Sequence, residues 1–259
     1  MPLIIGAKSA SAATGVANSC RFNPADSAYL TRTPASNGSE TISTLSMWFK
    51  RSGLLAQESL YFNSSDSNNK MIIRFNADAT FDVRGKVAGS FPLDFETNRL
   101  FRDPGAWMHF VFKFDTTQAT EADRFKMYVN GVQETSFSTE TYPAQDTNLS
   151  MNQTDDQAWI CAESGSGAYS NGYLAEVVFC DGQAYDASDF GEFDEDSPTI
   201  WKPKSADDIS GLTFGTNGFY LNFEDSADLG ADVSGNSNDL TATNLDATDQ
   251  ATDTPTNNF

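Results

Sequence analysis

Alternation of apolar and polar residues is the clearest signal along this chain. Its longest example lies between residues 107 and 133, where two strands are predicted at 108–114 and 124–129. Their apolar positions are Met108, Phe110, Phe112, Phe114, Phe125, Met127 and Val129. A period of two puts alternate side chains on opposite faces of a strand, so each strand should bury one face. Asn130-Gly131 follows at once and favours a tight hairpin turn, because both residues tolerate positive φ.

Shorter runs with strand character recur along the chain. They predict strands at 20–22, 28–32, 44–50, 60–62, 71–75, 80–84, 158–162, 171–180 and 218–223. In the run 171–180, Leu174, Val178 and Cys180 share the parity of Glu176, and 177–179 is apolar on both faces, as in a strand covered on each side. Asp186–Phe190 has the residues of a capped helical turn. About a dozen short strands and no convincing amphipathic helix predict an all-β sandwich of two antiparallel sheets.

The pattern divides the chain into three parts. Residues 1–19 form an extended lead, residues 20–223 the sandwich, and residues 224–259 an acidic, irregular segment. The last part has few apolar positions after Leu229, too few to order a segment by itself. We therefore expect a neighbouring chain to order it and its role to be attachment.

Charge narrows the possible partners. The 259 residues include 36 acidic and 16 basic ones, a formal net charge of −20, and no Lys or Arg follows Lys204. Phosphate backbones and anionic lipids repel such a chain, which argues against binding nucleic acid or a membrane surface. The acidity indicates a solvated surface or, alternatively, binding of divalent cations.

The three cysteines, Cys20, Cys161 and Cys180, form no metal-binding or redox motif. The only early apolar run, Leu3-Ile4-Ile5, is too short for the core of a secretion signal, and no window is long enough for a membrane span. Folding in a reducing cytosol with free thiols is therefore expected. A single His and no Cys-x-x-Cys pair make a zinc site improbable.

Several longer motifs resemble the laminin-G-like, or concanavalin A-like, jelly-roll family. The resemblance is carried by Trp107-x-His109-x-Val111, by the run 125–131 and by Gly172-Tyr173-Leu174-Ala175-Glu176-Val177. More narrowly, the runs 19–34, 101–120, 172–196, 201–204, 215–225 and 253–259 resemble a lectin-like module of bacteriophage structural proteins. In that module the chain often continues past Thr-Pro-Thr-Asn-Asn-Phe. Phe259 is therefore either a natural end or a point within a longer protein.

The resemblance implies a non-enzymatic virion structural protein, made in the host cytoplasm and displayed on the tail or head for adhesion, decoration or host attachment. Other virion proteins would be its partners, and analogy with phage fibres implies a homo-oligomer, a trimer. The alternative is a carbohydrate-binding lectin, calcium-dependent or not, that recognises a host surface glycan. A glycoside hydrolase is the third alternative, because jelly-roll scaffolds carry different sites.

Two groups of residues are candidates for ligand binding. Trp159, Tyr169 and Tyr173 lie near a Gly/Ser loop and are candidates for a sugar-stacking platform, although such aromatics often serve edge packing. Asp225, Asp228, Asp232 and Asn236 are the candidate ligands for Ca²⁺, the one cofactor we consider. Their spacing departs from the EF-hand pattern, and Asp/Asn/Gly runs also form plain turns.

The remaining acidic and basic candidates favour structural roles. Glu192–Asp196 superficially resembles a glucanase motif, but Gly191 before it and Ser-Pro after it indicate a solvated acidic loop. Glu176 should be partly buried and paired with an Arg or a backbone amide. His109, between Met108 and Phe110, favours packing over catalysis, since no Gly-x-Ser-x-Gly motif is present.

Overall fold

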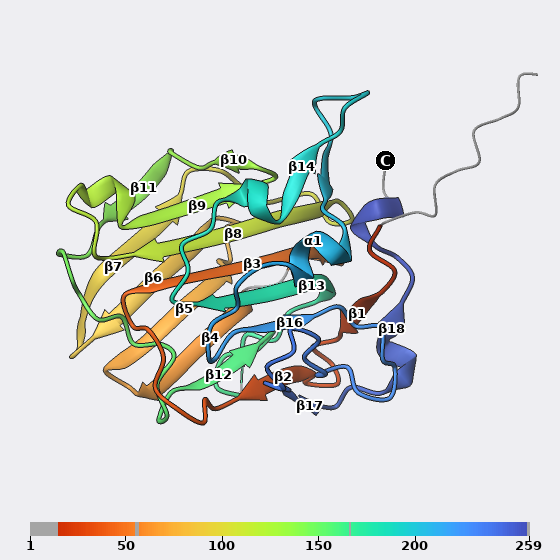
Figure 1. The fold of residues 1–259 in the computed structure, drawn as a ribbon, viewed down its shortest axis with the longest axis horizontal. Coiled ribbons are helices and arrows are strands. Elements are labelled where there is room, and N and C mark those ends of the chain that lie inside the picture. Colours follow the sequence, from red (N-terminus) through yellow and green to blue (C-terminus); the bar gives the residue numbers. More distant parts are fainter. Residues whose placement is uncertain (1–14, 55–56, 166, 258–259) are drawn as a thin grey trace, which may run out of the picture.

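A computed structural model describes residues 15–54, 57–165 and 167–257, which form two stacked antiparallel sheets (Figure 1). The predicted all-β sandwich is confirmed. The predicted lead over residues 1–19 lies mostly outside the described residues, apart from its last part, which enters the first strand at Ser19.

The first sheet is built around the two strands with the clearest alternation. Its order is β10 (Val132–Gln133), β9 (Phe125–Val129), β8 (Trp107–Asp115), β3 (Ile42–Arg51), β13 (Gly172–Asp181), β1 (Ser19–Phe22) and β18 (Gln250–Ala251), with β16 (Phe219–Leu221) also pairing with β13. The Asn130-Gly131 turn joins β9 to β10, and both residues have positive φ, as the sequence predicts.

The second sheet lies behind the first in Figure 1. Its order is β11 (Phe137–Thr141), β7 (Ser90–Thr97), β6 (Phe81–Val87), β5 (Asn69–Phe75), β4 (Glu58–Asp66), β12 (Gln157–Ile160), β2 (Tyr29–Arg32) and β17 (Thr241–Thr243). β14 (Gly191–Phe193) and β15 (Trp201–Pro203) form a separate hairpin. The helical elements are short: α1 (Ala206–Ser210), η1 (Glu121–Asp123), η2 (Ala187–Asp189), η3 (Ala247–Asp249) and η4 (Pro255–Asn257). The helical turn expected at 186–190 is η2, with Asp186 as its N-cap.

None of the helices in the described part of the chain is long and apolar enough to cross a membrane.

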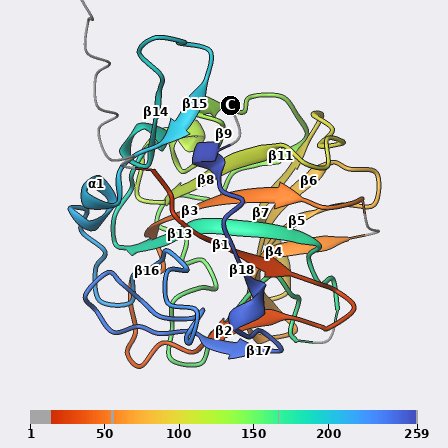
Figure 2. The same ribbon diagram turned by 90° about the vertical axis from the view of Figure 1, so that its right-hand side faces the viewer.

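The main core lies between the two sheets. Phe110, Phe112, Phe125, Met127 and Val129 are all buried there, so the predicted parity of β8 and β9 is correct. A second apolar cluster lies on the outer face of the first sheet, under η2, α1 and the β14–β15 hairpin. Figure 2 shows these elements on one side of the first sheet and the second sheet on the other. On the outer face of the second sheet, Phe62 and Ile72 are also buried, but the described residues form no second apolar cluster there.

The sequence predicts that Leu174, Val178 and Cys180 lie on the same face of β13, and this is wrong. A bulge interrupts the β3–β13 register between Ala175 and Val178, and Glu176 within it has φ of +48°. An extra residue of this kind reverses the faces that follow it. Leu174 and Val177 therefore face the main core, whereas Val178 faces the outer cluster. The expectation that both faces of this strand are covered is confirmed.

The C-terminal segment also differs from the prediction, because residues of the same chain hold it in place. Its strand β17 pairs with β2 and its strand β18 with β1, so it extends both sheets. Leu229 and Leu240 are buried in the main core. A few well-placed apolar residues and local hydrogen bonds thus do what a neighbouring chain was expected to do. The segment continues the sandwich beyond residue 223.

This arrangement predicts that the C-terminal segment contributes directly to stability. Leu240→Ala should lower the free energy of unfolding by about 2–5 kcal/mol, because it leaves a cavity in the main core. Val233→Ala, in the same segment but 42% exposed, should change it by less than about 0.5 kcal/mol. Denaturant unfolding of both variants measures the difference. Equal stability of the two would show that the segment does not belong to the cooperative fold.

Candidate functional site

An aromatic cluster lies on the outer face of the second sheet. Leu30 of β2 and Ile160 of β12 point into the core, so the neighbouring Tyr29 and Trp159 point outward. The Tyr29 and Tyr169 rings are 6.4 Å apart between centroids. A Cβ atom on Gly165 would come within 3.2 Å of Tyr29 Oη and 3.4 Å of Trp159 Nε1, so the loop at Gly165 joins the cluster. All three rings are half-buried.

Charged groups on the same face are paired with each other. Arg74 lies 3.5 Å from Asp82 and 3.4 Å from Glu163, and Arg84 lies 3.0 Å from Asp94. Such pairs cancel much of the local charge while leaving hydrogen-bonding groups around the rings. The chemistry of the face therefore suits an uncharged ligand with an apolar side.

The predicted platform of Trp159, Tyr169 and Tyr173 is only partly assembled. Trp159 and Tyr169 both adjoin Gly165. Tyr173 lies on β13, on the outer face of the opposite sheet, where Arg21 and Lys50 lie 5.5 and 5.9 Å from its ring. Tyr29 was not among the candidate binding residues predicted from the sequence. Its alternation with the apolar Leu30 was the available signal, because it places Tyr29 on the opposite face of the strand.

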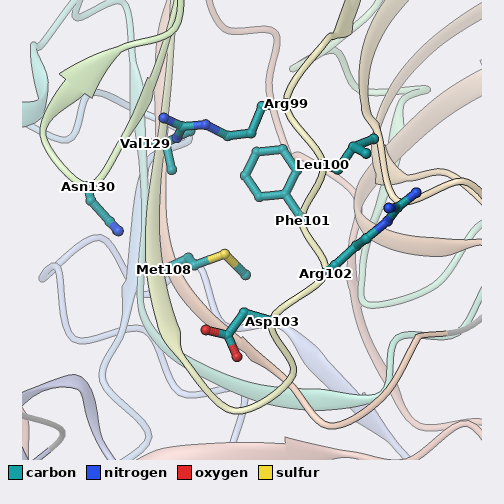
Figure 3. Close-up of a pocket in the computed structure, with 8 residues that line it drawn as sticks. All are labelled: Arg99, Leu100, Phe101, Arg102, Asp103, Met108, Val129 and Asn130. Carbon is teal, nitrogen blue, oxygen red and sulfur yellow. The ribbon is translucent and has the colours of Figure 1, made fainter.

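A pocket at one end of the sandwich was not predicted from the sequence. It has a volume of about 550 Å³ and lies between the β7–β8 loop and the ends of β8 and β9 (Figure 3). Its lining residues are Arg99, Leu100, Phe101, Arg102, Asp103, Met108, Val129 and Asn130. The local sequence sign of this pocket is the group of charged residues Arg99, Arg102 and Asp103 around the apolar Phe101.

The proposed calcium ligands do not converge on one point. Asp232 accepts hydrogen bonds from the backbone amides of Tyr220, Ser234 and Asn238 at 2.8–2.9 Å. Asp225 and Asp228 accept bonds from the amides of Ala227 and Gly230, which are local turn contacts. Asn236 donates to the carbonyls of Gly215 and Gly218. Over residues 15–54, 57–165 and 167–257, no group of three or more His, Cys, Asp or Glu side chains could hold a metal ion.

His109 has the packing role that the sequence favours. It is buried and stacks on Trp48 with ring centroids 4.6 Å apart. Trp201 Nε1 donates to His109 Nδ1 at 3.0 Å, so Nε2 carries the proton and donates to Ser46 Oγ at 2.8 Å. Burial lowers the pKa of His109 to about 3, which keeps the ring neutral. It is thus unsuited to acid–base catalysis near neutral pH.

The acidic run 192–196 lies at an exposed hairpin. Glu192 and Asp194 both contact Lys202, each at 3.3 Å. Hydrogen bonds, first from the backbone of Ser197, lower the pKa of Asp194. A glycosidase needs a carboxyl group with a raised pKa as its acid, and the pKa of Asp194 is shifted in the opposite direction.

All three cysteines are free and buried. Burial raises the pKa of Cys180 to about 12 and also raises the pKa of Cys20 and Cys161. Thiols in this state react slowly.

Comparison with known proteins identifies the scaffold. A family model described as the concanavalin A-like lectin/glucanases superfamily matches residues 24–187, well over half of the chain. A candidate carbohydrate-binding protein from Bacteroides ovatus has a similar structure, with a TM-score of 0.50 and 12% identity over 90% of this chain and 61% of that one. Domains LG4-5 of the mouse laminin alpha1 chain give 0.48 and 10%, covering 71% and 50%.

A heptameric pentraxin from Limulus polyphemus gives a TM-score of 0.47 and 14% identity, covering 66% of this chain and 78% of the pentraxin. The comparison with curated proteins found no match. At these identities the solved structures bear on the fold alone.

The buried Glu176 yields a pH prediction. It accepts a hydrogen bond from Tyr220 Oη, in place of the expected Arg or amide partner. Burial raises its pKa from 4.5 to about 7, although the Tyr220 bond opposes the rise. The folded state thus binds this proton more tightly than the unfolded state. Its stabilising effect is complete below pH 4.5 and is lost as pH rises through 7.

Glu176→Gln should therefore gain stability over the wild type as pH rises from 4.5 to above 7, by up to about 3 kcal/mol. Denaturant unfolding across that range measures the difference. The exposed Glu195→Gln serves as the control and should show no such trend. A constant difference between Glu176→Gln and wild type would contradict the assignment.

Proposed function

Because the chain belongs to the concanavalin A-like lectin/glucanase superfamily, we propose that it is a non-catalytic module that binds glycans. The observation that carries this proposal is the half-buried cluster of Tyr29, Trp159 and Tyr169 on the outer face of the second sheet. Half-buried rings of this kind offer flat apolar surface to the C–H face of a sugar at a low entropic cost.

Polar atoms of the same cluster would orient a bound sugar through hydrogen bonds. In the part of the chain that the structure describes, Trp159 Nε1 and Tyr29 Oη have no hydrogen-bond partner, so both are available to ligand hydroxyls. Gln157 Nε2 donates to Thr31 Oγ1 beside Trp159. A few such polar groups around an apolar surface are typical of specific ligand sites. Neutral oligosaccharides fit this combination best.

The carboxylates near the cluster support binding over hydrolysis. A retaining glycosidase needs two carboxyl groups about 5–5.5 Å apart, one of them available as a general acid. Asp82 and Glu163 both lie against Arg74 instead. Their charges are used in ion pairs on the sheet surface. Binding without catalysis is the simpler account.

We further propose that the module is displayed on a bacteriophage particle, on the tail or head, where it contacts a host glycan and other virion proteins. The support is the sequence runs at 19–34, 101–120, 172–196 and 253–259. A homo-oligomer, a trimer by analogy with phage fibres, belongs to the same proposal. Since the C-terminal segment docks on its own sandwich, association would use already folded modules.

The binding prediction is specific to the cluster. Trp159→Ala and Tyr29→Ala should each weaken binding to a neutral oligosaccharide by about tenfold, or ~1.4 kcal/mol, since each removes stacking area. Tyr173→Ala removes a comparable half-buried ring from the opposite sheet and should leave affinity unchanged. Calorimetric titration with oligomers of glucose, galactose, mannose and N-acetylglucosamine tests this. Unaltered binding by Trp159→Ala would refute the site.

The virion proposal predicts that the chain copurifies with intact particles at a fixed copy number. Quantitative mass spectrometry of gradient-purified particles measures the ratio, and immunogold labelling separates tail from head. Multiples of three would support the trimer. Absence of the chain from infectious particles would rule out the virion role and leave glycan binding to its own test.

A further inference from the structure

We propose that the pocket at the end of the sandwich is a second sugar-binding site, selective for uncharged sugars over uronic acids. The inference rests on the proposed glycan binding but concerns a different surface. The pocket is built from the β7–β8 loop, β8 and β9, and the aromatic cluster from β2, β12 and the loop at Gly165. The two sites share no residue, so a substitution in one leaves the side chains of the other in place.

The pocket combines an apolar floor with polar groups around it. Figure 3 shows Arg99, Phe101 and Asp103 on one side of the loop, toward Met108 and Asn130, while Leu100 and Arg102 point to the other side. Arg99 and Asp103 lie at opposite ends, with Phe101 and Met108 between them. A volume of about 550 Å³ lies in the usual range of small-molecule sites. It accommodates one or two sugar rings.

Three polar side chains retain hydrogen-bonding capacity. Asn130 Oδ1 accepts from the His109 amide at 2.8 Å, which leaves Asn130 Nδ2 as a donor on the pocket side. Arg99 Nε lies 3.3 Å from Glu134, and its terminal nitrogens have no partner in the described residues. Asp103 has neither a hydrogen bond nor an ion pair there. Together they offer two donors and one acceptor, which matches hydroxyl groups that both donate and accept.

The backbone of the pocket is fixed before any ligand arrives. Arg51 Nη1 donates to the Phe101 carbonyl at 2.7 Å, and Arg51 is itself buried and paired with Glu58. The Phe101 ring packs on Phe75 and Phe81 with centroids 5.6 and 5.8 Å away. At the other wall, the Asn130 amide donates to the His109 carbonyl at 2.9 Å. Such preorganisation reduces the entropic cost of binding.

The charge of the pocket residues favours neutral sugars over uronic acids. Glu134, whose side chain is 8% exposed, balances Arg99, so the Asp103 carboxylate has no compensating partner inside the pocket. The Arg102 side chain points away, toward the side of Asp78. The pKa of Asp78 is lowered mainly by hydrogen bonds from Thr80, with a further contribution from Arg102. A ligand carboxylate would meet Asp103 within a chain of net charge −20 and be repelled.

Amide chemical-shift titration of the full chain tests the pocket directly. The probes are the methyl glycosides of glucose, galactose and mannose, with the methyl glycosides of glucuronic, galacturonic and mannuronic acid as their charged counterparts. We expect at least one neutral glycoside to shift the amides of Asp103 and Asn130 saturably. Its charged counterpart should bind at least fivefold more weakly at low salt. Wild-type amides unmoved by all three neutral glycosides, or equal affinity for the uronic acid, would overturn the proposal.

Two exposed aspartates, one in the pocket and one in the β14–β15 hairpin, provide matched variants. Asp103→Ala should weaken the neutral titration by about tenfold, because it removes the acceptor, whereas Asp196→Ala, outside the pocket lining, should leave it unchanged. Equal titrations for both variants would also overturn the proposal. The Trp159→Ala variant separates the two sites. It should retain the shifts at Asp103 and Asn130 even where oligosaccharide binding is lost, and loss of those shifts in a folded Trp159→Ala protein would show that the pocket is not a separate site.

Discussion

Packing of phenylalanine rings between the two sheets is the constraint on which the rest of this structure depends. Phe81 stacks on Phe110 and Phe112 across the interface, with centroids 5.1 and 5.7 Å away, and meets Phe75 edge-on at 4.8 Å. Large rings fit only if each strand presents one parity to the core, since a shift by one residue would expose every ring. Phe101 joins the same cluster, so the core also sets the position of the end pocket.

The outer faces of the two sheets have different compositions. One face serves packing within the molecule, and the other carries the residues proposed to bind a glycan. On the first sheet the outward residues are apolar, among them Trp48, Val111 and Val178, and they require the cover that η2, α1 and the β14–β15 hairpin supply. On the second sheet the outward residues include ion pairs and half-buried aromatic rings, which are stable against water. The glycan proposal depends on the half-buried rings of this second face.

Many acidic residues of this chain organise its own backbone. Asp181 accepts hydrogen bonds from Ser39 N and Asn152 Nδ2 through one oxygen and from Asn217 N through the other. Asp232 does the same for the turn at 232–238. Each of these carboxylates links amide groups from different positions along the chain, and these hydrogen bonds help to order the acidic loops.

The sequence by itself determined most of the central strands, the parity of β8 and β9, the hairpin at Asn130-Gly131 and the all-β class, because these follow from side-chain period and local turn geometry. It did not predict β7, β11, β14, β15, β17 or β18. It also placed Trp159 and Tyr169 near one loop. Only the tertiary structure decided that Tyr29 joins them and that Tyr173 lies on the opposite sheet. It alone revealed the reversal of parity at Glu176, the docking of residues 224–257 and the end pocket. Each of these depends on which strands become neighbours across the sandwich, and contacts between residues far apart in the chain leave no trace in a local period.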